Sequence, residues 1–107
     1  MAAHFDGLET RDPKRREADL FGRLPAFLAR ATTSAPGWAK WLEGVDPVAV
    51  TSREALAKLP VLRKAELAEF QAKELPFGGF ADPKGLAGAR LFQSPGPIFE
   101  VQGPGVR

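Results

Sequence analysis

The fold is decided by one stretch near the end of the 107-residue chain, Leu91-Phe92-Gln93-Ser94-Pro95-Gly96-Pro97. Two apolar residues between Gly88 and this Ser-Pro-Gly-Pro run predict one β-strand, which ends near Gln93. The run itself predicts a loop, because proline has no N–H for a ladder and glycine tolerates unusual backbone angles. We expect only a Gly/Pro-rich tail from there to Arg107. A lone strand has no ladder partner, so the sequence predicts a fold that is incomplete.

Glycine and proline divide the chain into two parts of different character. The sequence holds 11 Gly and 10 Pro, and 12 of these 21 lie in residues 75–107. We therefore predict a helical N-terminal region over residues 1–74. Residues 75–107 form a second segment, rich in Gly and Pro, with the single strand and a degenerate loop of the phosphate-binding type. The predicted fold class is mostly α, with four short helices and one C-terminal β-strand.

The first helix is predicted to begin at Asp12-Pro13, because Asp caps helices well and Pro is tolerated at the first helical position. Pro25 lies inside the helical pattern and should kink the helix without ending it before Thr33. The helix carries a stripe of apolar residues at helical spacing, which we expect to face the core. These residues are Leu20, Leu24, Phe27, Leu28 and Ala31.

Three shorter helices are expected to follow. The second opens at Pro36 and closes at Gly44, and its Trp38 and Trp41 share one face, which favours core packing over ligand stacking. A capping box, with Thr51 and Glu54 as its reciprocal partners, begins the third helix, and Pro60 ends it. The fourth helix runs from about Arg63 to Lys73. The sequence Phe77-Gly78-Gly79-Phe80 then predicts a turn that requires positive φ.

Composition and charge exclude several classes of function. The formal net charge is +2, the apolar fraction is 44%, and cysteine is absent, so disulfides, thiolate metal sites and a Cys nucleophile are excluded. No apolar run is long enough to cross a membrane, and the N-terminus has no signal-peptide pattern, so we expect a cytoplasmic protein that does not bind membranes. The basic run at residues 14–16 is balanced by neighbouring acids, which argues against nucleic-acid binding.

The candidate site residues are Ser94 and Gly96. A strand that leads into Ser and Gly is typical of phosphate loops, where backbone N–H groups and hydroxyls surround an anion. Pro95 and Pro97 have no N–H to donate. A serine triad is not predicted, because His4 is the only histidine and lies near the terminus. No catalytic residue and no metal ligand is assigned.

The order of these signals resembles the N-terminal region of phenylacetate–CoA ligases and their relatives. The resemblance covers nearly the whole chain, and its most specific part combines two segments. These are Leu59-Pro60-Val61-Leu62-Arg63-Lys64-Ala65-Glu66-Leu67 and Pro76-Phe77-Gly78-Gly79. The family's phosphate loop reads Ser-Ser-Gly-Thr-Thr-Gly. Here Pro95, Pro97, Ile98 and Phe99 replace four of those residues, so only Ser94 and Gly96 carry over.

The resemblance implies an ATP-dependent ligase of the adenylate-forming, AMP-binding superfamily. Such an enzyme adenylates an aryl or acyl acid and then transfers the acyl group to coenzyme A, with Mg²⁺ neutralising developing charge. The family is several times longer than this chain. We therefore expect an N-terminal fragment that is inactive alone, binds none of these cofactors, and self-associates through its unpaired strand. The alternative is a stand-alone small helical module that docks a partner protein.

Overall fold

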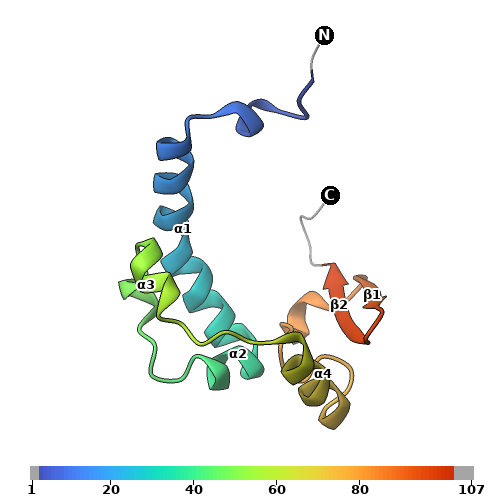
Figure 1. Ribbon diagram of the computed structural model, residues 1–107. Coiled ribbons are helices and arrows are strands. Elements are labelled where there is room, and N and C mark those ends of the chain that lie inside the picture. Colours follow the sequence, from blue (N-terminus) through green and yellow to red (C-terminus); the bar gives the residue numbers. More distant parts are fainter. Residues whose placement is uncertain (1–2, 103–107) are drawn as a thin grey trace.

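The computed structural model describes residues 3–102 and confirms a mostly helical chain with four α-helices in this range. Figure 1 shows α1, α2 and α3 grouped together, with α4 and a two-stranded hairpin beside them. Three short 3₁₀ helices, η1 to η3, complete the elements. In chain order the elements are η1 Gly7–Thr10, α1 Pro13–Ser34, α2 Pro36–Trp41, η2 Pro47–Ala49, α3 Arg53–Ala57, α4 Lys64–Lys73, η3 Pro83–Gly85, β1 Arg90–Ser94 and β2 Ile98–Gln102.

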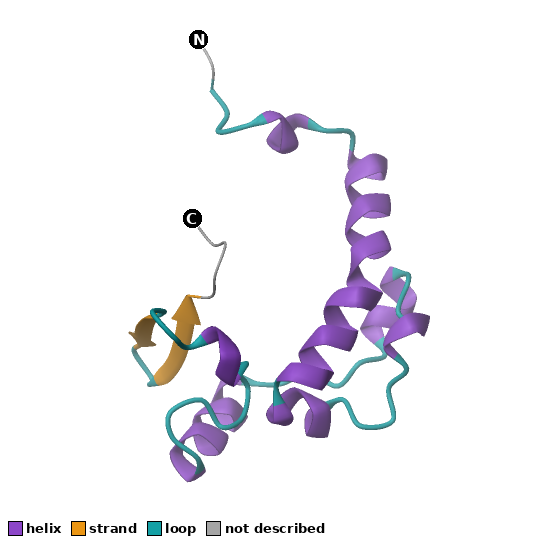
Figure 2. Cartoon of the chain, turned by 180° about the vertical axis from the view of Figure 1, so that it is seen from behind, coloured by secondary structure: helices purple, strands orange, loops and turns teal. Residues whose placement is uncertain are grey.

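Helix α1 begins as predicted. The Asp12 carboxylate accepts hydrogen bonds from the backbone N–H groups of Lys14 and Arg15, at 3.1 and 3.2 Å. The helix continues through Pro25 to Ser34, and Figure 2 shows it changing direction partway along its length. The prediction that the whole apolar stripe faces the core was wrong for two residues, because Leu20 and Phe27 are 47% and 56% exposed. Phe27 lines an open cavity together with Trp38 of α2 and Leu56 of α3.

Helix α3 is capped one residue later than predicted. The Ser52 hydroxyl accepts the N–H of Ala55 at 3.2 Å, which makes Ser52 the N-cap and leaves Thr51 exposed. With the cap at Ser52, position N3 is Ala55, which has no side chain able to reach back to the cap. The reciprocal Thr51–Glu54 box is therefore absent, and one hydroxyl caps the helix alone.

The prediction of a single strand was wrong. Strands β1 and β2 pair antiparallel, from Arg90 opposite Gln102 to Ser94 opposite Ile98. The three residues between them form the turn, in which Gly96 adopts a φ of 138°. The two prolines flank that glycine within the turn, so they interrupt no ladder hydrogen bond. The rest of the predicted tail, residues 103–107, lies outside the described residues.

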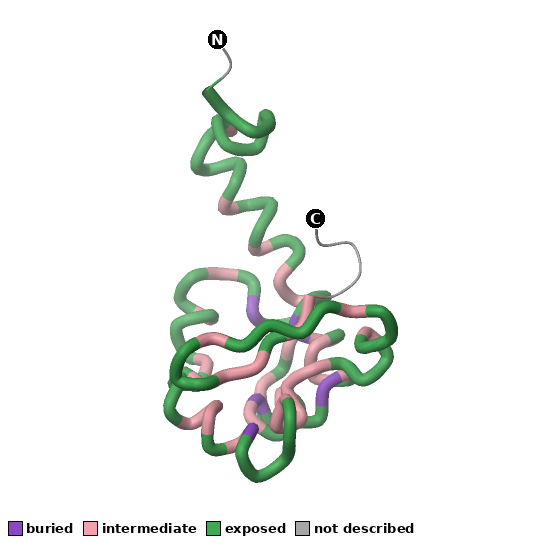
Figure 3. Tube along the Cα trace, turned by 90° about the vertical axis from the view of Figure 1, so that its right-hand side faces the viewer, coloured by how far each residue is buried: buried purple, intermediate pink, exposed green. Residues whose placement is uncertain are grey.

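A small core lies where α1 meets α2 and η2. Leu28, Leu42 and Val50 are buried there, and partly buried Trp38 and Trp41 pack against them, which confirms the packing role predicted for the two tryptophans. Aromatic rings extend the packing toward α4, with edge-to-face pairs of Trp38 with Phe80 and of Trp41 with Phe70. Figure 3 shows how few positions along the trace are buried.

The predicted turn at residues 77–80 is present and joins α4 to α2. Gly78 and Gly79 have φ angles of 62° and 82°, as the sequence required. The Gly37 N–H donates to the Gly79 carbonyl at 2.6 Å. A Cβ on Gly37 would lie 2.8 Å from the Gly79 carbonyl carbon. This close backbone approach fixes the position of α4, and with it the hairpin, beside α2.

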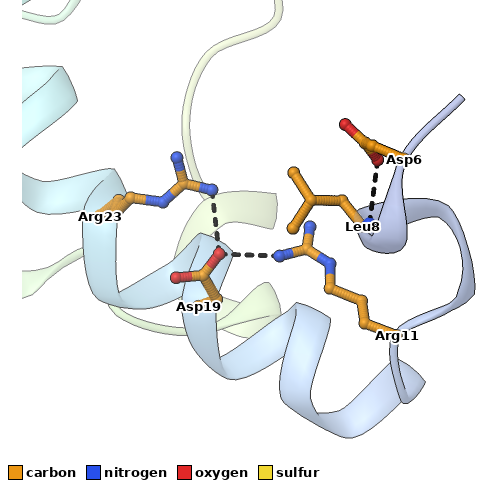
Figure 4. A network of polar contacts seen from close by, with 5 residues as sticks. All are labelled: Asp6, Leu8, Arg11, Asp19 and Arg23. Carbon is orange, nitrogen blue, oxygen red and sulfur yellow. Dashed lines mark hydrogen bonds and ion pairs between the residues drawn. The ribbon is translucent and has the colours of Figure 1, made fainter.

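The N-terminal arm is attached to α1 by an ionic network (Figure 4). The Asp19 carboxylate accepts from Arg11 at 2.8 Å and from Arg23 at 3.1 Å. Asp6 caps η1 by accepting the Leu8 N–H at 2.9 Å. Asp6 and Asp19 are therefore engaged locally, while the basic run at residues 14–16 remains exposed on α1.

Candidate functional site

The Ser94–Pro97 loop, predicted to be of the phosphate type, is the turn of the β1–β2 hairpin. Ser94 is half-buried, and its hydroxyl donates to the Ile98 carbonyl at 3.5 Å across the turn. Gly96 lies at the tip with its positive φ. The structure thus brings Ser94 and Gly96 together in one tight loop, with the Ser94 hydroxyl at its base.

A lysine that the sequence analysis did not single out lies against this loop. Lys64 is the first residue of α4, and its Nζ donates to the Pro95 carbonyl at 2.8 Å. A Cβ on Gly96 would lie 2.9 Å from both Cε and Nζ of Lys64. Glycine at position 96 leaves the space that the flexible end of Lys64 occupies, and the positive φ of 138° also favours glycine there. The contact joins an ammonium group to the tip of the hairpin across 31 residues of sequence.

The loop and the start of α4 bring several polar groups together. The Lys64 ammonium keeps two further N–H donors beside its bond to the Pro95 carbonyl, whereas the Ser94 hydroxyl already donates its proton to the Ile98 carbonyl. The start of α4 adds to this polarity, because no side chain caps the helix at Arg63. Within residues 3–102, no cluster of three or more His, Cys, Asp or Glu side chains could hold a metal ion. Phosphate binding at Ser94 and Gly96 therefore stays a prediction, and one ammonium group lies beside them.

The hairpin is held to α4 by a buried glutamine. Gln71 is 3% exposed, and its Nε2 donates to the Phe99 carbonyl at 2.9 Å. Its Oε1 accepts the Phe99 N–H at 2.8 Å. One side chain thus satisfies both backbone groups of a β2 residue, as a neighbouring strand would. This pair of bonds sets the position of the loop at the end of the hairpin.

An aromatic cleft of about 490 Å³ lies between this hairpin and the turn that follows α4. Aromatic and aliphatic side chains form most of its wall, and carboxylates lie at its edge. It is lined by Trp38, Leu67, Gln71, Phe77, Phe80, Ala81, Asp82, Phe99, Glu100 and Val101. Three of the four phenylalanines of the second segment, Phe77, Phe80 and Phe99, therefore line one cleft.

Sequence reasoning missed Lys64 and Gln71 for different reasons. Lys64 belongs to the Leu-Pro-Val-x-Arg-Lys segment that carries the resemblance, but nothing local indicates a contact with residue 95. Gln71 follows Leu67 by four positions, which places a polar side chain on the apolar face of α4. A polar residue at such a position indicates a buried hydrogen-bond partner, so this pattern could have identified Gln71 from the sequence.

Among the described residues, no helix is both long enough and apolar enough to span a membrane. No family model matches the sequence, and a search of curated proteins gives no match. Two crystal structures of 2-hydroxyisobutyryl-CoA ligase in the postadenylation state do match the fold. One is in complex with 2-HIB-AMP, with a TM-score of 0.76 and 26% identity. The other is in complex with R3-HIB-AMP, with a TM-score of 0.73 and 25% identity.

Each match covers 89% of this chain but only 21% of the ligase chain. The chain therefore spans about a fifth of the length of the structures that it resembles. This similarity agrees with the adenylate-forming superfamily that the sequence resemblance named. The fold described here is accordingly shared with part of an adenylate-forming CoA ligase.

Proposed function

We propose that this chain is a segment of an ATP-dependent acid–CoA ligase, in which it carries the phosphate-side loop and is inactive alone. The reaction is adenylation of a carboxylic acid followed by transfer of the acyl group to coenzyme A. The observation that carries the proposal is the match at a TM-score of 0.76 over 89% of the chain to a CoA ligase bound to an acyl-AMP. The resemblance to phenylacetate–CoA ligases favours an aryl or acyl acid as substrate.

Within this function, we assign phosphate binding to the Ser94–Pro97 loop and Lys64. ATP supplies the phosphate at which the carboxylate reacts, with Mg²⁺ neutralising charge on the nucleotide as the resemblance implies. The ammonium of Lys64, 2.8 Å from the Pro95 carbonyl, places positive charge where the loop lacks two N–H donors and the usual hydroxyls. That charge stabilises the phosphate oxygens and so compensates in part for the N–H and hydroxyl donors that the altered loop lacks.

The test is acid-dependent ATP–pyrophosphate exchange by the longer protein that contains this segment. We expect exchange with an aryl or acyl acid, reduced at least about tenfold by Lys64→Met, which corresponds to about 1.4 kcal/mol. Lys73→Met, at the other end of α4, serves as the matched control and should leave exchange unchanged. Absence of exchange with every acid tested would contradict the proposed function. Equal loss in both variants would contradict the part assigned to Lys64.

A further inference from the structure

One face of α4 holds the β1–β2 hairpin at two points. Lys64 and Gln71 lie on the same face of the helix, because seven positions are close to two full turns, and they are about 10 Å apart along its axis. The Lys64 ammonium donates to the Pro95 carbonyl, and the Gln71 amide exchanges two hydrogen bonds with the backbone of Phe99. The chain from Pro95 to Phe99 spans at most about 14 Å when extended, so the two points on the helix suit the two points on the hairpin.

The two bonds of Gln71 select one residue of β2. In an antiparallel pair, every second residue of a strand directs its N–H and carbonyl away from the partner strand. Phe99 is such a residue, since both its groups meet Gln71, and the next ones on either side are Pro97 and Val101. Pro97 has no N–H, so it could complete only one of the two bonds. A shift to Val101 would move the hairpin about 7 Å along α4 and carry the loop away from Lys64.

Of the two contacts, the one made by Gln71 is the rigid one. Its side chain is 3% exposed, so water does not compete for its bonds, and an amide bound at two atoms resists both sliding and rotation of the strand. The side chain of Lys64 is exposed and flexible, and its end fills the space beside Gly96. The buried amide therefore sets where the loop lies relative to α4, and the flexible lysine reaches the loop there.

We propose that Gln71 is a positioning residue for the phosphate loop, because it keeps the Ser94–Pro97 turn within reach of the Lys64 ammonium. This inference rests on the proposed function, in which Lys64 supplies the charge that meets a phosphate of ATP. Gln71 is assigned no contact with a substrate. Its loss should therefore affect the use of ATP and not of the carboxylic acid, and it should act only through Lys64.

The Michaelis constants of ATP–pyrophosphate exchange by the longer protein test this role. Gln71→Leu should raise the KM for ATP at least about fivefold and leave the KM for the acid unchanged, because the loop is displaced from the lysine. A variant that is merely unfolded in part has fewer active molecules, so it lowers the apparent kcat with the KM for ATP unchanged. Glu69→Leu, on the exposed face of α4, is the matched control and should change neither constant.

A double-mutant cycle shows whether Gln71 acts through Lys64. Lys64→Met already lacks the ammonium that the loop must reach, so adding Gln71→Leu to it should raise the KM for ATP less than about twofold further. Independent effects, in which the two substitutions multiply, overturn the inference. An unchanged KM for ATP in Gln71→Leu also overturns it.

Nuclear Overhauser contacts in the 107-residue chain give a readout that needs no activity. The wild type should show contacts between the Lys64 side chain and the Gly96 α protons, since a Cβ on Gly96 would lie 2.9 Å from Cε of Lys64. These contacts should disappear in Gln71→Leu and in Gln71→Asn, whose amide is one methylene too short to reach Phe99. They should persist in Glu69→Leu.

The two readouts separate this inference from the proposed function. Contacts between Lys64 and Gly96 that persist in both Gln71 variants overturn the inference, whatever the exchange assay gives. Contacts that are lost in those variants, in a protein whose wild type catalyses no exchange, support the positioning of the loop by Gln71 and contradict the proposed function instead.

Discussion

The Ser52 hydroxyl determines where α3 begins. Its bond to the Ala55 N–H, at 3.2 Å, satisfies one of the four N–H groups that a helix leaves unpaired at its start. We expect Ser52→Ala to lower the free energy of unfolding by about 1 kcal/mol, as for other N-cap losses. Thr51→Ala is the control and should change it little, because Thr51 is exposed and caps nothing. Urea denaturation of both variants measures the difference. A larger decrease in the free energy of unfolding for Thr51→Ala would support the predicted Thr51–Glu54 capping box instead.

At the scale of elements, the docking of the hairpin on α4 depends on Gln71. The replacement Gln71→Leu keeps the volume of the side chain but leaves the Phe99 N–H and carbonyl without their partner. We expect this to lower the free energy of unfolding by about 2 kcal/mol, because a buried polar group without a partner loses its hydration uncompensated. The Phe99 amide should also exchange with solvent faster, as measured by NMR.

The exposed Glu69 of the same helix offers a control for Gln71→Leu. Glu69→Leu makes a similar change in volume and polarity on a face with no hairpin contact, so it should leave both unfolding and Phe99 exchange nearly unchanged. Equal effects of the two variants would show that the loss at Gln71 reflects helix polarity and not the bonds to β2.

Elements set by local chemistry could be predicted from the sequence, and those set by distant contacts could not. Asp12-Pro13 located the start of α1, and Gly78 and Gly79 indicated a turn with positive φ, because each depends on its immediate neighbours. The hairpin was missed because the prolines around Gly96 were read as ending all strand structure. A three-residue turn admits them, and the second strand is apparent only once its register with the first is known.

The candidate site likewise combines residues that the sequence indicated with residues that it did not indicate. Ser94 and Gly96 were found because serine and glycine in a loop are a local signal. Lys64 reaches the loop from 31 positions away, and Gln71 reaches β2 from 28 positions away. Both contacts depend on the placement of α4 beside α2, which rests on the close approach of Gly37 to Gly79. No local pattern encodes that approach.

At the scale of the whole molecule, the described chain is more open than its length requires. Its radius of gyration is 16.1 Å, whereas a compact domain of about 100 residues has about 13 Å. An apolar cavity of about 330 Å³ beside the core includes the exposed Phe27, Leu56 and Val61 in its wall. Such open apolar surface fits a segment of a longer protein, since the match covers only 21% of the ligase chain.

This openness leads to the last prediction, that the 107-residue chain by itself binds ATP with a dissociation constant weaker than about 100 μM, or about 5.5 kcal/mol. At the loop the described residues offer a phosphate the ammonium of Lys64, while the Ser94 hydroxyl donates to the Ile98 carbonyl, and they form no cluster for Mg²⁺. So few donors recover little of the free energy lost in immobilising a flexible triphosphate. Isothermal titration calorimetry with ATP and Mg²⁺ measures this dissociation constant. Any weak binding heat that arises at the loop should disappear in Lys64→Met. A tighter constant that Lys64→Met leaves unchanged would place a nucleotide site elsewhere on the chain, and one that Lys64→Met abolishes would show that the loop suffices alone.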